Sequence, residues 1–147
     1  MSKKQKTKVF LDSSVIIAAL LSSTGGSFRI CKESHEGRLM LQANKYVLKE
    51  LREVLNRKYP ERLEQLSLLL QFAKIKIRSN PKVQLVEQSV KIIQAEDAPI
   101  LAGAIQARAN FLITLDRKDF MTKKLAESGL PLIIVTPETF FKEHWID

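Results

Sequence analysis

The sequence predicts an α/β protein, a three-layer α/β/α sandwich in which helices cover both faces of a central, mostly parallel sheet. Short apolar runs rich in Val, Ile and Leu alternate with longer segments of helical period, which is typical of βαβ units. The chain of 147 residues has the size of one domain, with no internal repeat and no long linker. We therefore predict a basic, flexible arm over residues 1–7 and a single domain over residues 8–147.

The first predicted strand, residues 9–11, is an apolar run that ends at Asp12. An apolar stretch over residues 15–21 follows, and its length suits a buried helix that the glycine pair at 25–26 ends. Ser27 has a side chain that can cap a helix, so a second helix is expected from there.

The middle of the chain repeats this alternation. Residues 39–41 predict the next strand, and residues 45–59 place apolar side chains at helical spacing before Pro60, which ends the helix. Residues 63–72 form another helical stretch, and residues 75–77 predict a short strand.

The last third of the chain predicts two further strands. Residues 83–95 stay open between helix and loop, whereas an apolar stripe over residues 100–105 predicts a helix. Residues 111–114 and 132–135 read as strands, and Pro137 opens a C-terminal helix at a position where proline is tolerated.

The charge balance favours a polyanionic partner such as RNA. Lys and Arg number 24 against 16 acidic residues, a formal charge of +8. Much of this excess lies in the first eight residues, so we expect Lys3, Lys4 and Lys6 to contact RNA. The plainer alternative is a solvated basic arm on a moderately basic body.

The composition argues against several other classes of protein. One cysteine, Cys31, and two histidines, His35 and His144, cannot build a disulfide framework or a Cys/His zinc cluster within one chain. No segment approaches the ~20 apolar residues that span a bilayer, and the first residues lack the apolar core of a signal peptide. We therefore expect a cytoplasmic protein without a membrane partner. Glycine-rich phosphate loops and a Gly-x-Ser-x-Gly elbow are absent from the sequence.

Four acidic residues occupy positions where an α/β fold places functional groups. Asp12 and Asp116 follow predicted strands, and the functional crevice of an open sheet lies at the carboxyl ends of its strands. Asp97 falls on the apolar face of the helix predicted over residues 100–105. Glu50 flanks the apolar stripe of the helix predicted over residues 45–59, and Glu53 points away from that stripe. Each aspartate could instead be the N-cap of the helix after it, so both interpretations stay open.

Clustered carboxylates raise each other's pKa unless a cation compensates their charge. Mg²⁺ and Mn²⁺ prefer oxygen ligands and keep waters for substrate and nucleophile. Such ions promote the displacement at phosphorus that cuts a phosphodiester. The four acids together therefore predict a divalent-metal site with Mg²⁺ or Mn²⁺ as cofactor.

Four short motifs resemble the PIN-domain family, and they are most similar to the small bacterial PIN proteins classed as toxins of toxin–antitoxin pairs, the VapC-like ribonucleases. The motifs are residues 9–16 (VFLDSSVI), residues 47–51 (VLKEL) around Glu50, Asp97 before an Ile-Leu-Ala run, and residues 114–116 (TLD). The resemblance extends over residues 8–141. It implies an α/β/α sandwich, dependence on Mg²⁺ or Mn²⁺, endoribonuclease activity and homodimerisation.

By position, the family's acidic quartet corresponds to residues that we have already singled out: Asp12, Glu50, Asp97 and Asp116. The resemblance also implies supporting roles for Thr114 and for Asp119, an additional acid found in some members. Ser14 departs from the asparagine that the family usually has there. Serine still donates and accepts a hydrogen bond but reaches less far, which weakens the expected orientation of Asp12.

The leading hypothesis is therefore a metal-dependent endoribonuclease that cuts single-stranded RNA, the toxin of a pair whose antitoxin is a separate protein. The alternative is a catalytically weak or inactive PIN-fold protein that binds RNA or regulates. A phosphorylated receiver-type switch fits poorly, since it needs paired acids after the first strand and an acceptor aspartate after the third.

Overall fold

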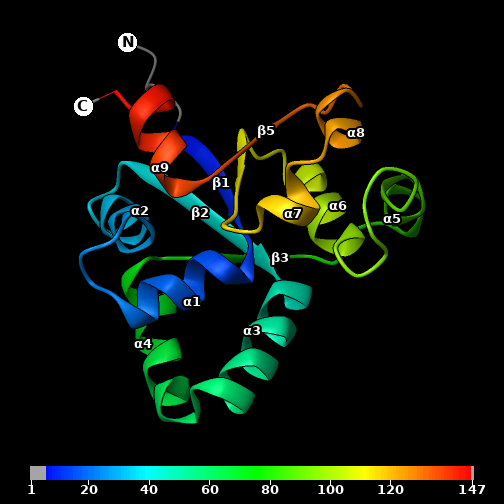
Figure 1. Cartoon of the computed structure of the whole chain (residues 1–147). Coiled ribbons are helices and arrows are strands. Elements are labelled where there is room, and N and C mark those ends of the chain that lie inside the picture. The colour runs from blue at the N-terminus through cyan, green and yellow to red at the C-terminus, as the bar shows by residue number, and fades with distance from the viewer. Residues whose placement is uncertain (1–5, 147) are drawn as a thin grey trace.

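The computed structural model describes residues 6–146. Its five strands are β1 (Thr7–Leu11), β2 (Leu39–Asn44), β3 (Lys76–Arg78), β4 (Phe111–Ile113) and β5 (Ile133–Val135). They form one sheet in the order β3-β2-β1-β4-β5, and every neighbouring pair is parallel (Figure 1). In the central register, Val9 of β1 lies between Leu41 of β2 and Phe111 of β4.

Helices occupy the segments between the strands and the segment after β5. They are α1 (Ser13–Leu21), α2 (Gly26–His35), α3 (Lys45–Lys58), α4 (Leu63–Phe72), α5 (Val83–Ser89), α6 (Ala98–Gln106), α7 (Arg117–Phe120), α8 (Lys123–Ala126) and α9 (Pro137–Thr139). A 3₁₀ turn, η1 (Pro60–Arg62), precedes α4, and a π-helical turn, η2 (Phe140–His144), continues α9.

The helices form two layers around the sheet. On one side α1 packs against α2, α3 and α4, while α2 also contacts β2 and α9. On the other side α6 packs against β2 and β4, and α5 packs against α6. The predicted α/β/α sandwich is therefore confirmed, and its sheet is parallel throughout (Figure 1).

The central strand lies in the middle of the core. Val9, Phe10 and Leu11 are fully buried, as expected for a parallel strand covered on both faces. By contrast, β3 is an exposed edge strand. No single helix among the described residues is long and apolar enough to cross a membrane, although α1 and α2, which meet at 95°, would pass as a bent pair by length and composition.

Several element boundaries differ from the prediction by one to three residues. The capping role expected of Ser27 is wrong: α2 begins at Gly26 with Gly25 at its N-cap, and Ser27 is buried in its first turn. Strand β2 continues to Asn44, because the side chain of this last residue is buried and hydrogen-bonded to Val47 and Pro99 rather than solvated. The open segment resolves into α5, followed by turns up to Asp97.

The predicted basic arm falls mostly outside this description. Lys3 and Lys4 lie outside the described residues. Lys6 is exposed and directly precedes β1, which begins at Thr7, the last residue of the predicted arm.

A candidate metal centre at the carboxyl edge of the sheet

The strand order creates a switch point at the carboxyl end of β1. The chain moves outwards from β1 through β2 to β3, then returns to place β4 and β5 on the other side. Ligand crevices in open α/β sheets lie at such a point. Asp12 follows β1 there, and its N–H donates to the Ile113 carbonyl at the end of β4 over 3.1 Å.

Asp12 is buried, and two hydroxyl groups hold its carboxylate. Its Oδ2 accepts hydrogen bonds from Ser14 Oγ and Thr114 Oγ1, each at 2.8 Å. Backbone N–H groups orient both hydroxyls, since Leu115 donates to Ser14 Oγ and Asp116 donates to Thr114 Oγ1, each at 3.0 Å. The hydroxyl protons are thereby directed at the carboxylate, which fixes its orientation.

This geometry answers two questions that the sequence leaves open. Asp12 occupies the N-cap position of α1 but makes no side-chain cap hydrogen bond, so capping does not account for it. Ser14, where the family usually has asparagine, reaches Asp12 across 2.8 Å. The shorter side chain therefore still orients this carboxylate.

Three aspartates form a tight group beside Asp12. Asp97, Asp116 and Asp119 each offer a carboxylate oxygen, and these oxygens lie within 4.8 Å of one another. Asp116 Oδ1 also accepts from the Asp119 N–H at 3.1 Å and so caps α7. Asp97 precedes α6 without capping it through its side chain. Asp116 is thus both a cap and a member of the group, whereas Asp97 is free of the capping role.

Glu50 approaches the site from α3. It is partly buried, and Ser13 Oγ donates a hydrogen bond to its Oε1. Ser13 follows Asp12 in the chain, so this bond ties Glu50 to the first strand end. Burial raises the pKa of Glu50, and the neighbouring charges of Asp12 and Asp116 raise it further against the opposing effect of Ser13.

Electrostatic repulsion links all five carboxylates. Burial, followed by the negative charges of Asp119, Asp12, Asp116 and Glu50, raises the pKa of Asp97 from 3.8 to about 7. A cation bound beside Asp97 would offset this repulsion.

The donor set fits a hard divalent cation. The three clustered side chains are all aspartates and offer oxygen atoms alone, the ligands that Mg²⁺ and Mn²⁺ prefer. Softer metals would require Cys or His ligands, and this group contains neither. The residues present therefore match the metal class that the sequence predicts.

The three aspartates that lie closest together are not all members of the predicted quartet. Asp119, expected only as a supporting acid, belongs to the tightest group, whereas Asp12 and Glu50 lie around that group. Lys6 directly precedes β1, at the opposite end of this strand from the site. About six residues of extended chain, or roughly 20 Å, separate it from the carboxyl edge of the sheet. A role for Lys6 in binding RNA stays a prediction.

Two positioning residues were missed from the sequence, Ser13 and Asn44. Asn44 Oδ1 accepts from the Val47 N–H at 3.1 Å and caps α3, while its Nδ2 donates to the Pro99 carbonyl at 3.2 Å. It therefore joins the helix that carries Glu50 to the start of α6. The sequence does contain a signal for Asn44, because asparagine directly before a helix with a periodic apolar face is a favoured N-cap.

Comparisons with known proteins agree with this architecture. A family model described as PIN domain matches residues 8–118. The crystal structure of VapBC2 from Rickettsia felis bound to a DNA fragment from their promoter contains a similar chain, with a TM-score of 0.67 and 16% identity, covering 88% of this chain and 98% of that chain. A search of curated proteins gave no match. At 16% identity the structural likeness shows the fold alone, but the family model covers most of the chain, and the protein therefore belongs to the PIN-domain family.

Proposed function

We propose that the protein is a divalent-metal-dependent endoribonuclease that cuts single-stranded RNA. The observation that carries this proposal is the group of three aspartates, with carboxylate oxygens within 4.8 Å of one another, at the carboxyl edge of a PIN-domain sheet. The formal charge of +8 supports a polyanionic substrate.

The residues of the site would have two roles, binding the metal ion and positioning the carboxylates. Asp97, Asp116 and Asp119 would hold the ion, with Asp12 and Glu50 close enough to act on their charge. When bound, Mg²⁺ or Mn²⁺ supplies a nucleophilic water near neutral pH and neutralises charge at the phosphodiester. Ser14 and Thr114 keep the Asp12 carboxylate oriented.

We further propose that the enzyme is the toxin of a toxin–antitoxin pair, acting in the cytoplasm as a homodimer. Support comes from the fold, which is similar to a chain in the VapBC2 structure. The expected partner is a small DNA-binding protein encoded by a neighbouring reading frame. Co-expression of this protein should block cleavage. Cleavage that this product leaves unchanged would remove the toxin role but not the nuclease.

A cleavage assay tests the enzymatic proposal. Wild-type protein should cut end-labelled RNA of mixed sequence in Mn²⁺ or Mg²⁺ and should stop in a chelator. Asp97→Asn and Asp116→Asn keep the shape of the side chain, and asparagine still caps a helix, so folding should survive. Their rates should fall by orders of magnitude, since each ~1.4 kcal/mol lost from a metal-assisted step costs tenfold.

Two results would contradict the proposal. Wild-type rates in both asparagine variants would show that these aspartates do not serve catalysis. RNA binding by the wild type without any cleavage in either metal would instead favour the non-cleaving alternative.

A further inference from the structure

A cavity of about 700 Å³ lies next to the chain segment that carries Asp116. Its walls come from four separate segments: the start of α2, the loop after β4, the start of α9, and η2. Arg117 lines this cavity and directly follows Asp116, so the two Cα atoms lie about 3.8 Å apart. Leu115, on the other side of Asp116 in the chain, also lines it, so the cavity lies next to the segment that carries Asp116.

The cavity carries the opposite charge to that centre. Its lining includes three cationic residues, Arg29, Arg117 and Lys142, and one acid, Glu138. The neighbouring centre holds five carboxylates that repel one another. A polyanionic strand that reaches those carboxylates needs cations at their side, and the cavity is placed to supply them.

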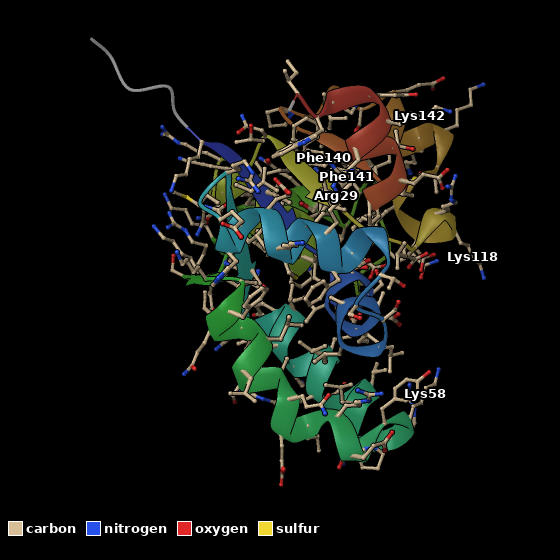
Figure 2. The ribbon with its side chains drawn as sticks, turned by 90° about the vertical axis from the view of Figure 1, so that its left-hand side faces the viewer. Arg29, Lys58, Lys118, Phe140, Phe141 and Lys142 are labelled. Atoms are coloured by element: carbon tan, nitrogen blue, oxygen red, sulfur yellow. The ribbon has the colours of Figure 1, made fainter. Side chains whose placement is uncertain are left out.

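Packing between aromatic side chains and Arg29 gives one wall its shape. The Arg29 guanidinium carbon lies 4.0 Å from the centroid of the Phe141 ring, a cation–π contact. Phe141 in turn packs edge-on against Phe140, with ring centroids 5.3 Å apart. Figure 2 shows Arg29, Phe141 and Lys142 in the upper part of the view and Lys58 in the lower part. Arg29 is thus presented on a fixed aromatic support.

The opposite wall depends on a close approach of two helices. A Cβ on Gly26 would lie 3.2 Å from Pro137 Cβ, so the glycine allows α2 to pack tightly against the start of α9. Gly25 at the N-cap gives α2 no side-chain cap, which leaves the first amide groups of this ten-residue helix available to an anion. These amides add to the three cations.

We propose that this cavity binds the sugar-phosphate backbone of the RNA strand next to the phosphodiester that is cut, with Arg29, Arg117 and Lys142 contacting phosphates. The inference rests on the proposed function, because it names a substrate subsite for that same centre. Phosphate contacts of this kind position a strand without reading its sequence. Binding here should therefore be tight at low salt and insensitive to RNA sequence.

Binding of a fluorescent single-stranded RNA, titrated in chelator at several salt concentrations, tests the subsite without cleavage. Lys142→Gln, Arg117→Gln and Arg29→Gln should each weaken binding, and each should lower the log–log salt slope by up to about 0.7, because each removes one cation from the RNA backbone. Arg29→Lys keeps both the charge and the cation–π partner, so its slope should stay near that of wild type.

Lys58→Gln is the matched control, because Lys58 is an exposed cation at the end of α3 that does not line the cavity and lies apart from Arg29 and Lys142 in Figure 2. Its affinity and slope should equal those of wild type. Lys142 is also exposed, so its variant keeps the test valid if Arg29→Gln fails to fold in a thermal melt. Unchanged slopes in all folded cavity variants, or an equal loss in Lys58→Gln, would overturn the subsite.

Cleavage in Mn²⁺ separates this inference from the proposed function. Lys142→Gln should raise KM and leave kcat near that of wild type, since Lys142 binds the strand outside the centre. Wild-type cleavage with no change in KM or salt slope in the variants would remove the subsite and leave the nuclease. Loss of binding confined to the cavity variants, with no cleavage by wild type, would remove the nuclease and leave the subsite.

Discussion

Asp12, Asp97 and Asp116 directly precede α1, α6 and α7, and their side chains make different contacts. Asp116 accepts a hydrogen bond from the N–H of Asp119 and caps α7, whereas Asp12 and Asp97 make no such bond. The Asp12 carboxylate is instead engaged by the hydroxyls of Ser14 and Thr114. Position at a helix start alone therefore cannot separate a cap from a candidate ligand.

Asp97 makes the stability of the metal-free protein depend on pH. Its pKa is about 7 in the folded state against an ordinary value of 3.8, so between these pH values the folded state binds more protons than the unfolded state. The contribution of Asp97 to the free energy of unfolding should therefore be largest below about pH 4. This contribution should be lost as the pH rises to about 7. Melting temperatures of wild type and Asp97→Asn, compared from pH 4 to pH 8 in chelator, measure this contribution.

Asp97→Asn should lose this part of the pH dependence. Mn²⁺ binds the ionised carboxylate, so it should raise the wild-type melting temperature more at pH 8 than at pH 6. Parallel pH curves for the two proteins would show that Asp97 titrates normally.

Glu50 and Glu53 offer a comparison within one helix. Glu50 is partly buried and accepts from Ser13, whereas Glu53 is exposed. Glu50→Gln should lose metal-dependent cleavage, while Glu53→Gln should stay within about 0.5 kcal/mol of wild-type stability and keep its activity. Cleavage rates and melts of both variants decide the matter, and equal activity would remove Glu50 from the centre.

At the scale of elements, Asn44 and Gly103 set the distance between the two helices that bring Glu50 and Asp97 to the site. Asn44 is fully buried and bonded at both ends of its amide, to Val47 and to Pro99. A Cβ on Gly103 of α6 would lie 2.2 Å from Asn44 Nδ2. The glycine is therefore required for this approach of α6 to the end of β2.

Gly103→Ala should reverse the usual effect of this substitution. In an ordinary helix interior it stabilises by about 0.5–1 kcal/mol, whereas here overpacking should cost about 1–3 kcal/mol and lower the cleavage rate. Denaturant unfolding measures the change. Because Asn44→Ala removes the clashing amide, the double variant should lose less stability than the two single losses combined. Simple additivity would mean that Gly103 and Asn44 do not interact.

Most elements could be predicted because their apolar periods are strong, as in α3 and α4. The errors have a common cause, which is tertiary contact. Strand β2 runs on to Asn44 because the Pro99 carbonyl of α6 accepts a hydrogen bond from its side chain, and α2 starts at Gly26 because Pro137 packs there. Neither partner is close in sequence.

At the scale of the whole molecule, strand order decides which acids meet. The sequence places Asp12 and Asp116 at strand ends, but only the return of the chain from β3 to β4 puts those ends side by side. Convergence at one edge could be predicted from the fold class. The prominence of Asp119 could not, because it depends on how α7 turns towards the start of α6.

The central claim is that these carboxylates hold a divalent cation, and anomalous scattering from a crystal soaked in Mn²⁺ tests it most directly. We expect a peak bounded by the carboxylates of Asp97, Asp116 and Asp119, the group whose oxygens lie within 4.8 Å of one another. The same soak of Asp116→Asn should weaken or abolish that peak. A wild-type crystal at neutral pH with no peak at these aspartates, or with manganese bound only elsewhere, would contradict the account.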